Sequence, residues 1–189
     1  MAASELKFES NDTRPMKLFF EDEGRFGRSN IISRCWSPKG ARAVVQKQIV
    51  RQYTYAYASV CPETGESHSL VLSGSNTETM NFYLKDLSEI YNHYRIVLCT
   101  DNAGWHISSG LIVPENVVFL YLPPYSPQLN PVEHVWSTTK YGCLANWPAP
   151  DVDTLHDRVE TELSLQSKNR AILSNHFRWA RLETDTLLC

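Results

Sequence analysis

Short apolar runs in the first part of the chain predict strands. Residues 16–20 (MKLFF) lead into three consecutive acids, so we expect a strand that delivers acidic side chains at its end and is followed by a loop. Residues 52–60 carry tyrosines at every second position, and a turn at residues 63–66 leads to another strand at 67–72. These strands predict an antiparallel meander.

The segment that links the first two of these strands also contains strand-forming residues. Residues 31–36 (IISRCW) and 41–46 (ARAVVQ) flank a Ser-Pro-Lys-Gly turn at residues 37–40. We therefore expect two or three strands between residues 31 and 60.

The spacing of apolar residues becomes helical after residue 75. Residues 76–91 carry apolar side chains at intervals of three and four, with Asn76 or Thr77 as the cap. Residues 95–100 (RIVLCT) form a continuous apolar run, which is typical of a strand buried on both faces. A further strand is predicted at residues 116–122.

Prolines divide the last third of the chain. Three prolines exclude regular structure from residues 123–127, whereas helices are predicted at 131–144 and 154–167, with partial helix in 169–189. Strands that are followed by alternating helices and strands indicate an α/β fold with a mixed sheet.

Length and composition fit one globular domain of 189 residues, of which 42% are apolar. A net charge of −3 argues against DNA binding through bulk positive charge. The charges are unevenly placed, however, because residues 24–52 hold seven Lys and Arg and no acid. The other 11 Lys and Arg face all 21 acids, a net charge of −10.

Other sequence features exclude several classes of protein. The start of the chain is polar and its apolar stretches are short, so we expect neither a signal peptide nor a transmembrane helix. Five widely spaced cysteines without zinc-site spacing predict free thiols in a reducing cytosol. Motifs of nucleotide-binding loops, zinc proteases and serine hydrolases are absent from the sequence.

Two aspartates follow predicted strands. Asp22 and Asp101 each come at the carboxyl end of an apolar strand, where open α/β sheets keep their sites. The two carboxylates meet only if the strands are parallel neighbours. The alternative is that each aspartate caps a loop or a helix, which is a common structural role.

Glu133 also has two interpretations. Asn130 to Glu133 is a typical helix start, in which Asn130 caps the helix and Glu133 reaches back to it. The rigid proline-rich loop before it would equally hold Glu133 at one point of a site. Three converging carboxylates would raise one another's pKa unless cations lay between them, and oxygen ligands favour Mg²⁺ or Mn²⁺. Two such ions suit phosphoryl transfer.

Three segments carry a family resemblance. In order, FFEDEGRFGR, DNAGWH and LPPYSPQLNPVEHVW resemble the signature segments of the DDE transposase catalytic domain of the mariner superfamily, particularly its bacterial insertion-sequence branch. CWSPKGAR, YAYASVCPETGE and PENV extend the likeness over about residues 16–150. The 31 residues between Asp101 and Glu133 suit the bacterial branch.

The resemblance implies a ribonuclease H-like fold, an α/β fold whose mixed five-stranded sheet is flanked by helices. It implies that Asp22, Asp101 and Glu133 are the catalytic and metal-binding triad, holding two Mg²⁺ or Mn²⁺ ions. Within the first acidic cluster the resemblance implies Asp22, because the family pattern is an Asp followed by Glu before an Arg-Phe pair, here Arg25 and Phe26. Glu21 is expected on the other face of the strand.

The resemblance also divides the chain. Residues 1–15 are expected to be a flexible tail, residues 16–150 the DDE endonuclease domain, and residues 151–189 a C-terminal helical extension packed on that domain. A complete transposase of this kind carries helix-turn-helix modules before its catalytic domain, and only 15 residues precede it here. We therefore expect a catalytic part without its DNA-binding region, to which a separately encoded N-terminal half is a candidate partner.

The expected function is Mg²⁺-dependent cleavage of DNA at transposon ends, followed by attack of the freed 3′ hydroxyl on target DNA. The expected partners are transposon-end and target DNA and, during transposition, a second copy of the chain. The expected location is the bacterial cytoplasm, with association to the nucleoid when the protein binds DNA. The alternatives are an inactive transposase-derived remnant, acting at most as a DNA-binding or interaction module, and a cellular nuclease that cuts RNA–DNA hybrids.

The basic stretch after the first strand is the main DNA-facing candidate, although a solvated hairpin would have the same composition. His106 is interpreted as a phosphate contact or as a packing residue near a helix start. The hydroxyls of Tyr125 and Ser126 in the proline-rich loop are interpreted as hydrogen-bond partners of DNA phosphates or of the loop backbone. The candidate DNA-binding residues are Arg25, Arg28, Lys39, Arg42, His106, Tyr125, Ser126 and Lys140.

Overall fold

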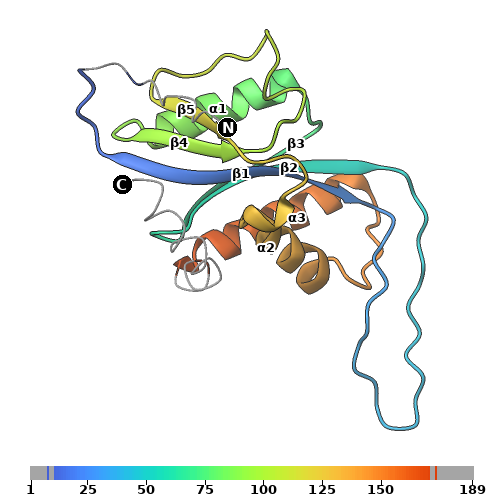
Figure 1. Cartoon of the computed structure of the whole chain (residues 1–189). Helices are drawn as coiled ribbons and strands as arrows, with labels where there is room; N and C mark the ends of the chain where they lie inside the picture. Colours follow the sequence, from blue (N-terminus) through green and yellow to red (C-terminus); the bar gives the residue numbers. More distant parts are fainter. Residues whose placement is uncertain (1–7, 9–10, 171–172, 174–189) are drawn as a thin grey trace.

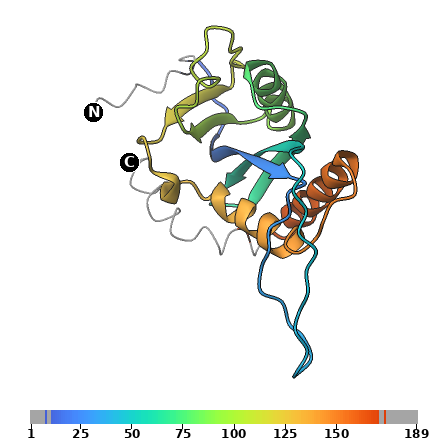
Figure 2. The same cartoon turned by 90° about the vertical axis from the view of Figure 1, so that its right-hand side faces the viewer.

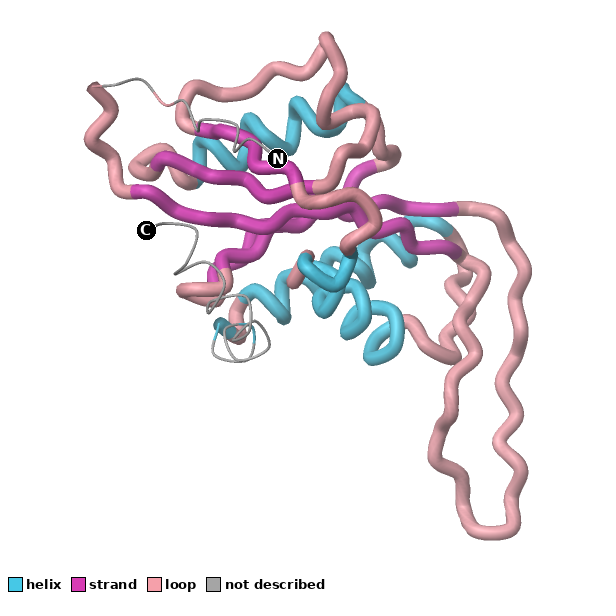
Figure 3. The backbone as a smooth tube through the Cα atoms, in the orientation of Figure 1, coloured by secondary structure: helices cyan, strands magenta, loops and turns pink. Residues whose placement is uncertain are grey.

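Five strands form one mixed sheet in the order β3-β2-β1-β4-β5 in the computed structural model, which describes residues 8, 11–170 and 173 (Figures 1 and 3). The strands are β1 (Met16–Gly27), β2 (Tyr53–Cys61), β3 (Glu66–Leu72), β4 (Arg95–Thr100) and β5 (Val117–Tyr121). β1 pairs antiparallel with β2 and parallel with β4, and β4 pairs parallel with β5. The predicted mixed five-stranded sheet is confirmed.

Helices cover both faces of the sheet (Figures 1 and 2). They are α1 (Thr77–Ile90), the 3-10 turn η1 (Pro127–Leu129), α2 (Val132–Ser137), its π-helical continuation η2 (Thr138–Cys143) and α3 (Val152–Ser167). On one face, α1 buries Met80 and Leu84 in a core that includes Phe19 of β1. On the other face, Trp136 and Leu155 of α2 and α3 share a core with Phe20.

Alternation along β1 sorts its three acids onto the two faces. Phe19 belongs to the core under α1, whereas Phe20 belongs to the core under α2 and α3. Side chains two residues apart on a strand share a face. Glu21 and Glu23 therefore lie on the same face of the sheet as Phe19, and Asp22 lies on the same face as Phe20.

β1 is longer than predicted. Its pairing with β4 ends at Phe20 and Cys99, but its pairing with β2 continues to Gly27 and Tyr53. The strand does not stop at the acids because β2 continues to satisfy its backbone groups after β4 has ended. Asp22 thus lies within β1, just beyond the end of its ladder with β4.

The strands predicted at residues 31–36 and 41–46 do not form. Residues 28–52, the basic arm, leave the sheet as a long loop that projects from the body of the molecule (Figures 1 to 3). Trp36 and Val44 are 103% and 89% exposed, so these strand-forming side chains have no surface to bury against. The turn at residues 37–40 is confirmed by the bond from the Ala41 N–H to the Pro38 carbonyl.

The helix predicted at residues 131–144 is divided, because α2 ends at Ser137 and continues as the π-helical η2. At the start of α2 the Asn130 side chain accepts a bond from the Val132 N–H, as its predicted capping role requires, whereas the described residues show no bond from the Glu133 side chain back to Asn130. α3 begins two residues before its predicted start, with the Asp151 side chain accepting a bond from the Thr154 N–H at 2.6 Å.

The predicted tail and the predicted C-terminal extension are only partly described by the structure. Residues 1–7, 9–10, 171–172 and 174–189, which include Cys189, lie outside the described residues. The described end of the tail lies against β4, since the Arg95 N–H donates to the Pro15 carbonyl. The four described cysteines are free. Within the part of the chain that the structure covers, no helix has the length and apolarity that a membrane span requires.

Candidate active site

The three predicted acids line one open cleft of about 370 Å³. Asp22 comes from β1, Asp101 directly follows β4, and Glu133 lies in the first turn of α2. The remaining walls are the segment after Asp101, the proline-rich loop and Asn130. The fold thus brings together three carboxylates from three distant parts of the sequence.

Two features of the fold produce this arrangement. β1 and β4 are parallel neighbours, which is the condition that the two aspartates require in order to meet. The side-chain amide of Asn130 donates to the Glu21 carbonyl at 2.8 Å and so ties the proline-rich loop to β1. Its Oδ1 accepts from the Val132 N–H at 3.2 Å, which fixes the start of the helix that carries Glu133.

An indole holds the Asp22 carboxylate. The Nε1–H of Trp136 donates to Asp22 Oδ2 at 2.9 Å. Burial raises the pKa of Asp22 to about 7, and the negative charges of Glu23 and Glu133 add to the rise. The bond from Trp136 acts in the opposite direction and lowers the pKa. A partly buried carboxylate with acidic neighbours is a group that a cation would stabilise in its charged form.

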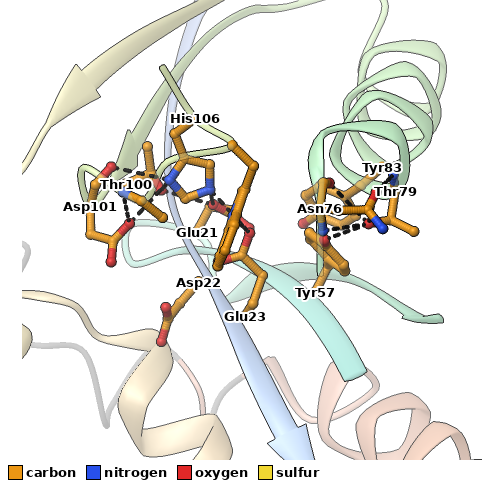
Figure 4. Close-up of polar contacts among 12 residues, drawn as sticks. Glu21, Asp22, Glu23, Tyr57, Asn76, Thr79, Tyr83, Thr100, Asp101 and His106 are labelled. Carbon is orange, nitrogen blue, oxygen red and sulfur yellow. Dashed lines mark hydrogen bonds and ion pairs between the residues drawn. The ribbon is translucent and has the colours of Figure 1, made fainter. Parts of the chain in front are cut away.

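A second acidic cluster lies behind the cleft, on the face of β1 that carries Glu21 and Glu23 (Figure 4). His106 is 1% exposed, and its Nε2 lies 3.0 Å from Glu23 Oε1 and 3.6 Å from Glu21 Oε2. Its Nδ1 lies 3.1 Å from Asp101 Oδ1. The imidazole therefore stands between the two strands that carry the aspartates of the cleft.

Burial shifts the titration of this cluster. The pKa of Glu21 is raised well above its ordinary range by burial and by the charges of Glu23 and Asp22. Burial would lower the pKa of His106, but its bond to Glu23 and the charge of Glu23 outweigh that effect and raise it. The pKa values of both side chains therefore lie above their ordinary values.

Either cluster has ligand atoms for a metal, but their fit differs. One atom each from Glu21, Glu23 and His106 lie within 4.8 Å of one another. Thr100 Oγ1 already donates to Glu21 Oε2 at 3.0 Å, and Trp105 Nε1 to Glu23 Oε1 at 2.6 Å. The cleft instead offers three carboxylates next to open space, which suits hard cations that keep part of their water.

Four predicted DNA-binding residues are accessible at the cleft or on the basic arm. Tyr125 and Ser126 line the cleft, and Tyr125 is fully exposed with a positive φ of 57°. The Ser126 hydroxyl donates to the Pro124 carbonyl at 3.3 Å, as the backbone interpretation expects. Lys39 and Arg42 are exposed at the far end of the arm.

The other predicted DNA contacts lie outside the cleft lining. The Arg28 guanidinium bonds the Ala149 and Pro150 carbonyls and Gln52 and so fixes the base of the arm. Arg25 lies over the Tyr53 ring, and Lys140 faces the Phe26 ring. The predicted phosphate contact of His106 is wrong, because the ring is buried and both of its nitrogens face protein atoms.

Two important contacts were not expected from the sequence. Trp136 packs in the apolar core, and its indole N–H also holds Asp22. A signal was available, since Trp136 lies three residues after Glu133 and therefore on the same side of a helix. The pairing of Glu23 with His106 has no such local signal, because Glu23 lies within β1 and His106 in the turn that follows β4.

Comparison with known proteins agrees with this architecture. The DDE superfamily endonuclease family matches residues 17–156, and the chain belongs to that family. It is 38% identical over 104 residues to the uncharacterized protein y4pE/y4sA of Sinorhizobium fredii (strain NBRC 101917 / NGR234), covering 54% of this chain and 77% of that protein.

Solved structures with the same fold include two complexes of Mos1. The strand transfer complex superposes with a TM-score of 0.65 at 16% identity, covering 87% of this chain and 51% of that one. The pre-cleavage transpososome gives 0.62 at 14% identity, covering 87% and 54%. This chain spans about half the length of those chains, and the likeness confirms the predicted ribonuclease H-like fold.

Proposed function

We propose that the cleft cleaves DNA and transfers the cut strand in transposition, with the help of divalent metal ions. The observation that carries this proposal is the convergence of Asp22, Asp101 and Glu133 on one open cleft. Membership of the DDE superfamily endonuclease family and a fold shared with the Mos1 strand transfer complex support it.

Asp22, Asp101 and Glu133 would hold two Mg²⁺ or Mn²⁺ ions. Their carboxylate oxygens, the open space beside them and the raised pKa of Asp22 fit hard divalent cations. When bound, such ions activate water and stabilise the charge on the attacking and leaving oxygens of an in-line phosphoryl displacement. Mos1 mariner paired-end complexes are described with Mn and with Mg.

The chain's own residues would position the substrate. The prolines around Tyr125 and Ser126 hold these side chains at the edge of the cleft, where their hydroxyls would bond phosphate oxygens. Lys39 and Arg42 on the basic arm would neutralise phosphates farther along the duplex. Arg25 and Lys140, which line a small neighbouring pocket, would extend the same contact surface.

The proposal includes a partner arrangement. Transposition joins two DNA ends, and Mos1 forms paired-end complexes, so two copies of this chain would act together on transposon-end and target DNA. The protein would act in the bacterial cytoplasm, on the nucleoid when bound to DNA.

A cleavage assay tests the proposal. The purified chain is incubated with supercoiled plasmid, duplex oligonucleotide or RNA–DNA hybrid in Mg²⁺ or Mn²⁺. We expect nicking of DNA that Asp101→Ala reduces by about 10³-fold, since the variant loses an electrostatic stabiliser of the transition state. Equal cleavage by Asp101→Ala would refute the triad, preference for the hybrid would favour a ribonuclease, and an inert, folded wild type would favour a remnant.

A further inference from the structure

The polar network behind the cleft connects the two aspartates of the proposed metal site. The backbone ladder between β1 and β4 ends at Phe20 and Cys99, and both Asp22 and Asp101 lie beyond it. Direct pairing between β1 and β4 therefore does not reach the two aspartates, although β2 still pairs with Asp22 and β5 with Thr100. Side-chain contacts across the gap add to what sets the separation of the two carboxylates.

His106 spans this gap. On one side, its Nδ1 lies 3.1 Å from both the carbonyl oxygen and Oδ1 of Asp101. On the other, its Nε2 lies 3.0 Å from Oε1 of Glu23, the residue next to Asp22 on β1. A buried imidazole thus joins the end of β4 to the part of β1 that carries the first aspartate (Figure 4).

The residues around His106 hold it in this orientation. Thr100 Oγ1 donates to Glu21 Oε2 at 3.0 Å, and so its oxygen is oriented to accept from His106 Nδ1, 3.1 Å away. Trp105 Nε1 donates to the same Glu23 oxygen at 2.6 Å. Because these groups are buried, their bonds are strong and their loss is costly.

Asp101 needs such support. Its side chain is 63% exposed, and in the described part of the chain its other recorded hydrogen bond comes from the Ala103 N–H at 2.8 Å, on the same oxygen. A carboxylate at the end of a strand would otherwise sample several rotamers. The contacts of Oδ1 with His106 and Ala103 restrict this side chain, which lines the cleft.

We propose that His106 is a positioning residue, which bridges Asp101 and Glu23 and thereby sets the separation of the Asp22 and Asp101 carboxylates for metal binding. The inference rests on the proposed function, since it takes these aspartates as metal ligands. His106 itself does not touch the substrate. Its role is comparable to that of groups that orient metal ligands, whose loss weakens metal affinity about 10- to 100-fold.

Mn²⁺ binding to the DNA-free protein, measured by calorimetry, tests the bridge. In His106→Gln the amide would reach toward Glu23 and in His106→Asn toward Asp101, so each variant keeps one half of the bridge. We expect both to weaken Mn²⁺ binding by about 10-fold or more. His68→Gln is the matched control, because His68 makes a similar contact with Asp86, at 2.9 Å, away from the cleft; its Mn²⁺ affinity should match that of wild type.

The sign of the effect separates positioning from simple charge. Oxygen atoms of Asp101 and Glu23 face the two ring nitrogens, and a protonated imidazole in that position would repel a cation. A purely electrostatic role predicts tighter Mn²⁺ binding in both His106 variants, and a purely structural role predicts a lower Tm with unchanged affinity at low temperature. Either result would overturn the proposal.

Glu23 provides a second test if the His106 variants do not fold. Glu23→Gln keeps an acceptor oxygen for the imidazole, whereas Glu23→Ala removes it, and both lose the same charge. We expect Glu23→Gln to bind Mn²⁺ more tightly than Glu23→Ala, and equal affinities would contradict the bridge. Asp22→Ala distinguishes the two levels of the argument, since undiminished Mn²⁺ binding in that variant would refute the proposed metal site itself.

Discussion

Three consecutive acids on β1 lie in two different environments. Asp22 faces an open cleft together with Asp101 and Glu133, whereas Glu21 is completely buried on the opposite face. The residue type and the strand are the same, so the difference comes from what each face meets. One face meets open space and further carboxylates, and the other meets an imidazole and hydroxyl and indole donors. Surroundings, more than acidity, decide which carboxylate suits a metal.

The largest expected effect sharpens this comparison directly. Asp22→Asn removes a charge from the cleft, and we expect it to reduce Mn²⁺-dependent nicking by about 10³-fold. Glu21→Gln removes the ionisable carboxyl group one residue away on the buried face, and we expect less than about a tenfold change. The measurement is the initial rate of plasmid nicking. Comparable losses in the two variants would break the distinction between the faces.

The pH dependence of stability tests the same distinction without a substrate. Because the folded-state pKa of Asp22 is about 7 and its ordinary value is 3.8, the folded protein binds more protons in this window. The free energy of unfolding of the metal-free protein must then fall as pH rises from about 4 to 7. The contribution of Asp22 to this fall is at most about 4 kcal/mol. Glu21 acts in the same direction.

Added Mg²⁺ should reverse this loss. We expect 10 mM Mg²⁺ to raise the Tm at pH 8 by several degrees and to have little effect at pH 5, where Asp22 is protonated. Thermal scans at both values measure the difference. A Mg²⁺ effect that is equal at the two pH values, or that persists in Asp22→Asn, would contradict the assignment.

Two indoles form a matched pair of probes. Trp136 donates to Asp22 and Trp105 to Glu23. Trp136→Phe removes the bond that orients a proposed metal ligand, so we expect Mn²⁺ affinity to fall about 10-fold. Trp105→Phe leaves Glu23 its bond to His106, and a loss of about threefold is expected. Calorimetric titration of both variants checks the ranking, and a reversed ranking would show that the buried face controls metal binding more strongly.

The smallest effect concerns the basic arm. Lys39→Ala and Arg42→Ala should each lower the slope of log affinity against log salt by about 1, as expected for lost phosphate contacts. Lys85→Ala on α1, on the other side of the sheet, is the control. Fluorescence anisotropy with labelled duplex DNA gives the slopes. Unchanged slopes in the arm variants would assign the arm to something other than DNA.

The parts of the fold that pack in the apolar core were predicted correctly from the sequence. The apolar run at residues 95–100 and the helical spacing of residues 76–91 correspond to β4 and α1. Residues 31–36 and 41–46 also contain strand-forming residues, but they have no neighbouring strand to pair with. Composition alone does not reveal whether such a neighbour exists. Period-two alternation correctly placed Glu21 opposite Asp22.

The wrong prediction at the site has a similar cause. His106 follows Asp101 closely, which made a phosphate contact reasonable, but its partner Glu23 is more than 80 positions earlier in the chain. Whether this histidine faces solvent or the Glu23 carboxylate depends on how the turn after β4 lies against β1. That relation is a property of the assembled sheet, and local sequence does not contain it.

The most direct test of the central claim is a crystal structure with Mn²⁺ and anomalous diffraction data. The account predicts anomalous density in the cleft, in contact with the carboxylates of Asp22 and Asp101 and within reach of Glu133. Density between Glu21, Glu23 and His106 with an empty cleft would contradict it, and so would the absence of anomalous density at both clusters under saturating Mn²⁺.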